Sequence, residues 1–267
     1  MEIIGYLASI LIGISLGLIG SGGSILTVPL LVYFFHVSPL LATTYSLAIV
    51  GLSSIAGVIS RLKQKLVDFK TIFIFGIPSI IGVFSSRKFI LPAIPELIYD
   101  GPAILVTKSH FIMLFFATLM LAAALSMILG KNKKEQEGVL PVYGLSLILV
   151  GFGEGSLTGI VGAGGGFLII PALVLLAKLP MKKAIATSLV IISIKSLVGF
   201  TGDLLHTAVD WSFLSKIILL ATLGIITGNY LNKKMEGAKL KKGFGFFVLA
   251  MAIIIFIEQF FFSNLIK

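Results

Sequence analysis

Two glycine-rich segments organise this chain. The first is Gly20-Ser21-Gly22-Gly23-Ser24, which continues into Ile25-Leu26-Thr27-Val28-Pro29. The second is Gly162-Ala163-Gly164-Gly165-Gly166, which continues into Phe167-Leu168-Ile169-Ile170-Pro171 and begins 142 residues later, at 162 rather than 20. Glycine inside an apolar run weakens a helix, so each half is predicted to contain a helix broken at this point. In a duplicated membrane protein, paired interruptions of this kind indicate the substrate site of a secondary transporter.

The composition identifies the environment. Hydrophobic residues make up 57% of the chain, charged residues 12%, and the mean hydropathy is +1.11. Soluble domains are about one-quarter charged, so the chain is predicted to be an integral membrane protein. The net charge of +10 arises from loops between apolar runs, a pattern typical of membrane topology rather than nucleic-acid binding. The chain has no cysteine, so no disulfide or thiolate metal site is expected.

The apolar runs predict ten membrane segments. They cover 3–19, 25–36, 40–60, 70–86, 110–130, 141–161, 167–177, 184–202, 213–231 and 244–262. With all ten crossing, fifteen Lys and Arg residues lie in loops on one side and four on the other, whereas eight crossings divide the same loop charges 11 to 8. Cytoplasmic loops are enriched in Lys and Arg, so ten segments with both termini outside are favoured. Residues 87–109 are then an external loop.

Five segments per half give the halves opposite orientations. We therefore predict an all-α, polytopic fold of two inverted repeats, with short helices after the glycine-rich breaks. The first repeat covers 1–130, a cytoplasmic linker 131–140, and the second repeat 141–267. We expect the first run to be a mature span in the cell membrane rather than a cleavable leader peptide.

The doubled motif resembles that of the sulfite exporter TauE/SafE family. The similarity also includes Ala184-x-x-Thr187-Ser188 with its echo Ala42-x-x-Tyr45-Ser46, and Val67-Asp68-Phe69 with Val209-Asp210-Trp211. It extends over nearly the whole chain. The resemblance implies a multi-pass transporter of sulfur-containing anions such as sulfite or organosulfonates. It does not fix the direction of transport.

The start of each short helix is the predicted anion site. Free backbone N–H groups and the positive end of the helix dipole favour anions there, and the alternative is that the glycines only allow close packing. The candidate contacts in the two motifs are Gly20, Ser21, Gly22, Gly23, Ser24, Gly162, Ala163, Gly164, Gly165 and Gly166. Further candidates begin the following helices: Thr44, Ser46, Thr187 and Ser188. Gly13, Gly17, Gly155 and Gly159 are interpreted as packing positions.

A lysine inside an apolar run is the other candidate. Lys195 lies midway through 184–202, and a charge at that depth costs about 3 kcal/mol on insertion scales. It is predicted to contact the anion, to form a salt bridge with Glu154, or to do both in turn. Glu154 is also the candidate carrier of a coupled proton. Asp68 and Asp210 are predicted to cap helices, and His36, His110 and His206 have no metal-site spacing.

The favoured function is a secondary transporter of small sulfur-containing anions that works by alternating access. The alternatives are a non-transporting membrane scaffold and a carrier of a different small anion or organic acid. An intramembrane enzyme is disfavoured because neither His-x-x-x-His nor Gly-x-Ser-x-Gly occurs. The expected partners are therefore the lipid bilayer, a small anion and a proton or other coupling ion, with neither cofactor nor nucleic acid.

Overall fold

The structure is a computed structural model of the whole chain. It describes residues 2–20, 23–100, 105–129, 144–162, 164–204, 207–232 and 237–261. The predicted linker at 131–140 lies outside these residues, as do Ser21, Gly22, Ala163 and His206.

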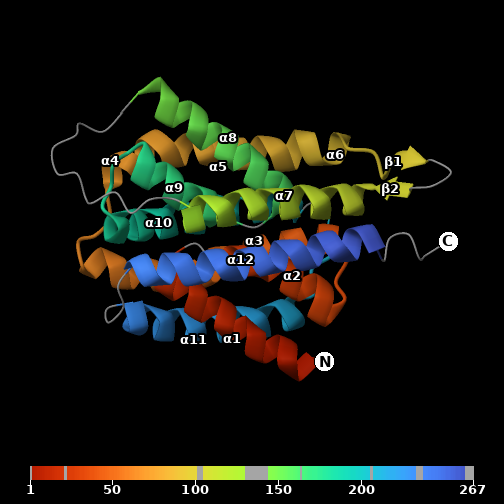
Figure 1. Cartoon of the computed structure of the whole chain (residues 1–267), viewed down its shortest axis with the longest axis horizontal. Coiled ribbons are helices and arrows are strands. Elements are labelled where there is room, and N and C mark those ends of the chain that lie inside the picture. The colour runs from red at the N-terminus through yellow and green to blue at the C-terminus, as the bar shows by residue number, and fades with distance from the viewer. Residues whose placement is uncertain are drawn as a thin grey trace.

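The chain is a bundle of helices (Figure 1). The first half contains α1 (Glu2–Ile19), α2 (Ser24–Phe35), α3 (Pro39–Lys63), a continuous rod from Phe69 to Ala93, and α7 (Lys108–Leu129). The rod consists of α4 (Phe69–Thr71), η1 (Ile72–Gly76), α5 (Ile77–Ser85), η2 (Ser86–Ile90) and α6 (Leu91–Ala93), in which η1 and η2 are π-helical. The second half contains α8 (Leu145–Val161), α9 (Gly166–Leu175), α10 (Met181–Asp203), α11 (Trp211–Asn232) and α12 (Gly237–Phe261). All ten predicted segments are therefore helical.

Both glycine-rich segments interrupt a helix, as predicted. The α1 helix ends at Ile19 and α2 begins at Ser24, while α8 ends at Val161 and α9 begins at Gly166. The helices after the breaks are short, with 12 residues in α2 and 10 in α9. At about 1.5 Å per residue, neither is long enough to cross the hydrocarbon layer alone.

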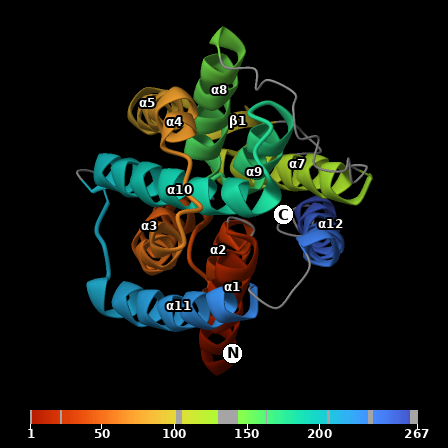
Figure 2. The same cartoon turned by 90° about the vertical axis from the view of Figure 1, so that its left-hand side faces the viewer.

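Helices α3 and α10 form the centre of the bundle. They pack against each other, and in Figure 2 they lie between α11 on one side and α8 with α5 on the other. In both helices 72% of the most apolar window is buried, against 33–39% in the other three long spans. At their crossing the Ser193 Oγ donates a hydrogen bond of 3.2 Å to the carbonyl oxygen of Gly51. These two residues occupy equivalent positions in the two halves.

Contacts between the halves are reciprocal. The α1 helix of the first half packs on α11, and α8 of the second half packs on α5, the counterpart of α11. The backbone N–H of Asp68 donates to the Thr187 Oγ1 at 2.9 Å, and that of Asp210 donates to the Tyr45 hydroxyl at 2.8 Å. The carboxylates of Asp68 and Asp210 accept from backbone N–H groups three residues later, at 2.9 and 3.0 Å. The predicted capping roles of both aspartates are confirmed.

The glycines interpreted as packing positions do bring helices together. A Cβ on Gly13 would lie 2.0 Å from the Ala221 carbonyl oxygen, and one on Gly155 would lie 2.0 Å from that of Ser79. Backbone atoms cannot move aside for such a contact without moving the helix. Small residues therefore fix the distance between α1 and α11, and between α8 and α5, as they do in membrane helix pairs.

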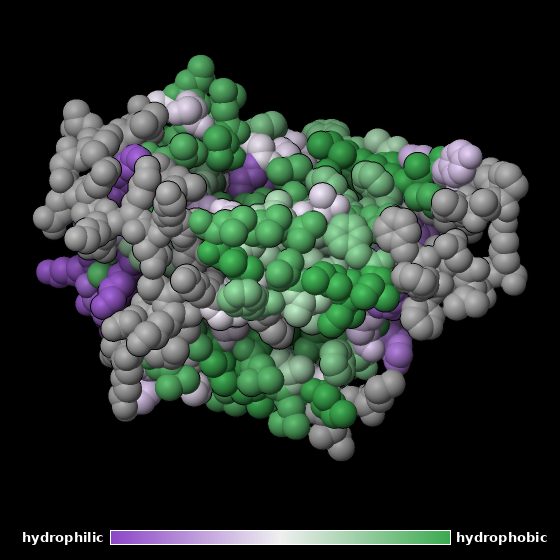
Figure 3. Space-filling model, in the orientation of Figure 1, coloured by the Kyte–Doolittle hydropathy of each residue, from purple (hydrophilic) through white to green (hydrophobic). Residues whose placement is uncertain are grey.

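The outer surface suits a bilayer. Within the described residues, five helices are long and apolar enough to span one, and four more apolar helices are shorter, including α1 and α8. Figure 3 shows hydrophobic side chains over the middle of one face, with hydrophilic residues gathered towards its ends. In Figure 1 the junction between α3 and α4 and the start of α10 lie at the left-hand end, while the N-terminus, the C-terminus and the β1–β2 hairpin lie at the right.

The prediction that residues 87–109 form an external loop is wrong for residues 87–93. The rod continues to Ala93, so Arg87 lies inside a helix and is buried. The strands β1 (Leu97–Asp100) and β2 (Leu105–Thr107) then pair as an antiparallel hairpin before α7. The apolar run appears to end at 86 only because Arg87 and Lys88 interrupt it, and hydropathy alone does not reveal that Arg87 has buried partners.

Candidate functional site

A buried ion pair lies beside the second glycine-rich break. The Lys195 Nζ on α10 donates to the Glu154 Oε1 on α8 at 2.5 Å, and both side chains are at most 3% exposed. The Ser79 Oγ donates to the other carboxylate oxygen of Glu154 at 2.7 Å. The Lys195 Nζ also donates to the Thr158 Oγ1 at 3.3 Å. The predicted salt bridge is therefore present, and it joins the rod, α8 and α10.

Gly165 lies directly on this ion pair. A Cβ added there would come within 2.2 Å of the Glu154 Oε1 and 2.5 Å of the Lys195 Nζ. Gly165 also has a φ of +70°, a conformation that strains residues with a side chain. It is the N-cap of α9, and no side chain caps that helix start. The structure thus brings the positive end of α9 and a lysine ammonium to one place, the combination expected to attract an anion.

The first glycine-rich break has no counterpart of this ion pair among the described residues. Gly23, the counterpart of Gly165, would place a Cβ against Ile12 and Leu16, which correspond to Glu154 and Thr158. The residue corresponding to Lys195 is Ser53, whose hydroxyl donates back to the Ile49 carbonyl oxygen at 2.5 Å. Gly20 instead packs against Ile185 of α10. The two breaks therefore share a backbone arrangement, but among the described residues only the second has a buried ion pair.

Most of the hydroxyl groups predicted to contact the anion form hydrogen bonds within the protein. The Thr44 Oγ1 donates to the Asp203 Oδ2 at 2.7 Å, and the Ser188 Oγ donates back to the Ile185 carbonyl oxygen at 2.9 Å. Thr187 accepts the bond from Asp68 described above. The buried Ser46 hydroxyl has no hydrogen-bond partner within the described part of the chain. None of these four is shown in contact with Lys195 or Glu154.

Ser196 was not among the predicted contacts. Its buried Oγ lies 3.1 Å from where a Cβ of Gly164 would be, and it has no hydrogen-bond partner among the residues described. The side chain follows Lys195 on α10 and faces the same glycine-rich segment. An unsatisfied buried hydroxyl beside a helix start is a suitable donor for an oxyanion.

A second buried ion pair was missed by the sequence analysis. The Arg87 Nη1 donates to the Asp203 Oδ2 at 2.7 Å and to the Thr43 Oγ1 at 3.1 Å. This arrangement joins the rod to α10 and α3. Asp203 belongs to α10 and is buried, although the predicted apolar run of this helix ended at 202. The only sequence signal is that both residues directly follow apolar runs.

Arg61 is a third buried cation, with neutral partners. Its Nη1 donates to the Asn232 Oδ1 at 3.0 Å and its Nη2 to the Gly17 carbonyl oxygen at 3.1 Å. Asn232 in turn donates to the Leu18 carbonyl oxygen. Together they satisfy carbonyl groups at the C-terminal end of α1, where cations are favourable.

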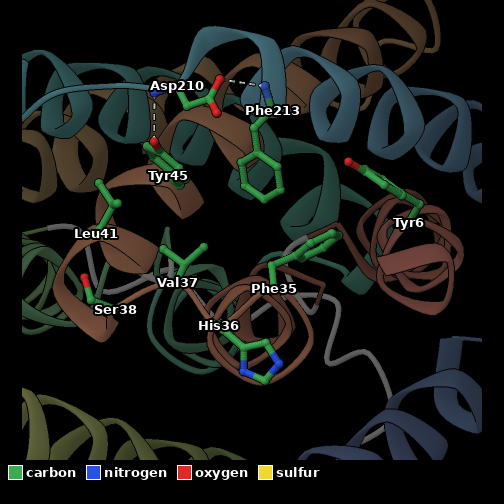
Figure 4. A pocket seen from close by; sticks show the side chains of 9 residues that line it. All are labelled: Tyr6, Phe35, His36, Val37, Ser38, Leu41, Tyr45, Asp210 and Phe213. Carbon is green, nitrogen blue, oxygen red and sulfur yellow. Dashed lines mark hydrogen bonds between the residues drawn. The ribbon is translucent and has the colours of Figure 1, made fainter. Parts of the chain in front are cut away.

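A separate pocket of about 390 Å³ opens where α2, α3 and α11 meet. Aromatic rings surround it in Figure 4, where Tyr6, Phe35 and Phe213 converge. It also contains Asp210, whose carboxylate disfavours an anion. No predicted site residue lines it. No group of acidic, histidine or cysteine side chains suited to a metal ion occurs within the described ranges.

Comparison with known proteins establishes the family. Residues 5–255 match the family described as "Sulfite exporter TauE/SafE". The chain belongs to this family. It is 30% identical to a probable membrane transporter protein of Xylella fastidiosa strain 9a5c, over 92% of this chain and 91% of that protein. It is also 30% identical to the probable membrane transporter protein YunE of Bacillus subtilis, over 82% of this chain and 84% of YunE.

A further relative is the probable membrane transporter protein MJ0441 of Methanocaldococcus jannaschii, at 29% identity over 73% of this chain and 71% of that protein. No solved structure matches the chain. The chain is thus a multi-pass membrane transporter of the TauE/SafE family, and this family comprises transporters rather than enzymes.

Proposed function

We propose that this TauE/SafE protein is a secondary transporter of small sulfur-containing anions such as sulfite or organosulfonates. The observation that carries the proposal is the contact of Gly165 with the Lys195–Glu154 pair at the uncapped start of α9. An oxyanion placed there meets backbone N–H groups, a lysine ammonium and the Ser196 hydroxyl. These are the donors that recognise sulfonate and sulfite oxygens.

Glu154 supplies a means of coupling. In the structure it neutralises Lys195, so an arriving anion competes with the carboxylate for the ammonium group. A second negative charge beside Glu154 is unfavourable in a buried site, and a proton on Glu154 removes the repulsion. We therefore propose that Glu154 takes up a proton when the anion binds, which couples transport to the proton gradient.

We further propose that the two halves, 1–130 and 141–267, are inverted repeats joined by the 131–140 linker. The reciprocal pairs of α1 with α11 and α8 with α5 support this proposal, as do the matched hydrogen bonds of Asp68 and Asp210. In Figure 1, α7 runs from the hairpin end towards the left and α12 runs towards the C-terminus at the right. The Lys-rich left-hand end is then cytoplasmic and both termini lie outside. Rocking of the halves about the α3–α10 crossing gives alternating access.

The test is flux into liposomes. The purified full chain is reconstituted, and uptake of sulfite, thiosulfate, sulfate, a short alkylsulfonate and acetate is measured with and without a pH gradient. We expect sulfite or sulfonate uptake that exceeds empty liposomes and changes with the gradient. Uptake of acetate alone supports an organic-acid carrier, and absence of flux for every solute supports a non-transporting scaffold.

A further inference from the structure

The second glycine-rich segment lies between two buried cations. Gly165, the fourth of its five residues, contacts Lys195, as described above. Gly162, at its beginning, lies against the other cation, because a Cβ there would come within 2.5 Å of the Arg87 Nη2. Arg87 reaches this point from the rod, whereas Lys195 comes from α10. The segment is therefore bordered by positive charge near both of its ends.

Arg87 uses one of its three nitrogens in hydrogen bonds to the described residues. The Nη1 makes both hydrogen bonds, to Asp203 and to Thr43. The Nε and Nη2 are buried and have no hydrogen-bond partner in the part of the chain that the structure describes. The Arg87 side chain is 0% exposed, so bulk water does not satisfy these groups. Unsatisfied buried donors are uncommon in folded proteins, and an ion, a ligand or a buried water is the usual explanation.

The free nitrogens form a definite chemical edge. The N–H groups of Nε and Nη2 point the same way in the plane of the guanidinium, and this fork matches two oxygens of one oxyanion. Lys195 offers no comparable edge, because its ammonium is already bonded to Glu154 and Thr158. The two cations therefore differ in kind: one is a point charge in a closed ion pair, and the other has an open bidentate edge.

We propose that Arg87 is a second anion contact of the transport site and binds two oxygens of the substrate through Nε and Nη2. This inference rests on the proposed function and extends it to the substrate class, an anion with at least two oxygens on one centre. Asp203 neutralises the arginine when the site is empty, and Thr43 fixes the guanidinium by accepting from Nη1. Because Gly162 lies on the free edge, Gly162 has to move aside when the anion enters.

Arg61 provides a matched control. Like Arg87 it is a buried arginine on a long helical segment, and the whole residue is 2% exposed against 3% for Arg87. Both of its terminal nitrogens are bonded, to Asn232 and to Gly17. Its Nε has no partner among the described residues, but Nη2 is occupied, so Arg61 lacks the free Nε–Nη2 pair of Arg87. Lysine at either position keeps the charge and removes the fork. A difference between the two substitutions therefore reports the fork rather than the loss of a buried arginine.

The experiment measures anion binding to the full chain in nanodiscs by calorimetry. Arg87→Lys is expected to weaken sulfite binding about tenfold or more, since one charged hydrogen bond is lost. It should change the binding of bromide, a single-atom anion, by less than about threefold. Arg61→Lys is expected to leave both affinities within about threefold of wild type. Equal sulfite affinity in wild type and Arg87→Lys, or an equal loss for sulfite and bromide, would overturn the inference.

Asp203→Asn supplies a second test that does not depend on whether Arg87→Lys folds. The amide keeps hydrogen-bonding capacity towards Thr44 and Arg87 but removes a negative charge from beside the anion. Sulfite should bind about fivefold more tightly or better, while a purely structural ion pair predicts unchanged or weaker binding. If wild type itself binds no sulfite or sulfonate, the proposed function fails and this inference with it. If wild type binds sulfite but the variants do not show these changes in affinity, the inference about Arg87 fails while the proposed function stands.

Discussion

The exchange of Lys195 for methionine separates the structural role of the buried ion pair from its role in transport. In the Lys195→Met variant the Glu154 carboxylate keeps its bond from Ser79 but loses its cation. Both partners are at most 3% exposed, so solvent does not replace the lost charge. Breaking a buried pair by removing one partner destabilises a protein by about 3–5 kcal/mol. We expect a loss of that size in the free energy of unfolding.

A second substitution should restore the fold. Glu154→Gln removes the uncompensated charge and keeps a side chain that can accept from Ser79. The double variant Lys195→Met with Glu154→Gln is expected to lie within about 1 kcal/mol of wild type, because buried pairs replaced as a unit are often neutral. Glu154→Gln alone also breaks the pair and should cost about 3–5 kcal/mol, so the coupling energy from the four proteins should be about 5 kcal/mol or more.

The assay combines unfolding in a detergent titration, followed by circular dichroism, with sulfite uptake into liposomes. The exposed Lys216 on α11 supplies the control, and Lys216→Met should change stability by less than about 0.5 kcal/mol and leave uptake intact. The double variant should be folded and unable to take up sulfite. A stable double variant that transports sulfite at the wild-type rate would refute the contact between Lys195 and the anion.

Three further predictions test separate parts of the structure. Gly165→Ala should abolish uptake and lower the free energy of unfolding by about 2 kcal/mol or more, because the added Cβ is strained at a positive φ and clashes with Glu154. Gly153→Ala is the control: a Cβ there has no neighbouring atom within 4 Å, so its effect on stability should be neutral or favourable. Removing either helix cap, with Asp68→Ala or Asp210→Ala, should cost about 1 kcal/mol in each case, and unequal losses would argue against equivalent roles in the two halves. Single cysteines that replace Lys63 or Lys182 should react with an impermeant thiol reagent only from the cytoplasmic side, and a cysteine that replaces Tyr99 only from outside. Labelling of the cysteines at 63 and 182 from opposite sides would exclude the proposed topology.

Sequence reasoning recovered the parts of the fold that depend on local pattern. Apolar runs of helical length predicted all ten helices, and the glycine clusters predicted both breaks because glycine is unfavourable inside a helix. The pairing of Glu154 with Lys195 was also predictable, since a buried lysine needs an acidic partner and α8 offers one inside its apolar run. Asp68 and Asp210 were identified as caps by their position before a helix.

The parts that failed depend on which helices meet. Arg87 and Asp203 are distant in sequence and each lies at the edge of an apolar run, so hydropathy assigns them to loops. Only the packing of the rod against α10 shows that they are buried together. Likewise Thr44 and Thr187 were expected to face the anion, and their hydrogen bonds to Asp203 and Asp68 require knowledge of neighbouring helices. No pattern within one segment contains that information.

Protection of a cysteine at Ser196 tests the central claim most directly, namely that an anion binds between the second glycine-rich segment and α10. The chain has no native cysteine, so Ser196→Cys provides a single thiol. The rate of its reaction with a small thiol reagent is measured with and without ethanesulfonate. Ethanesulfonate is used because sulfite itself reacts with thiol reagents. Thr201→Cys, at an exposed position of α10, is the control. We predict that ethanesulfonate slows modification at 196 by about tenfold at a concentration ten times its dissociation constant and leaves 201 unaffected. Equal modification rates at 196 with and without a sulfonate that the protein transports would contradict the account.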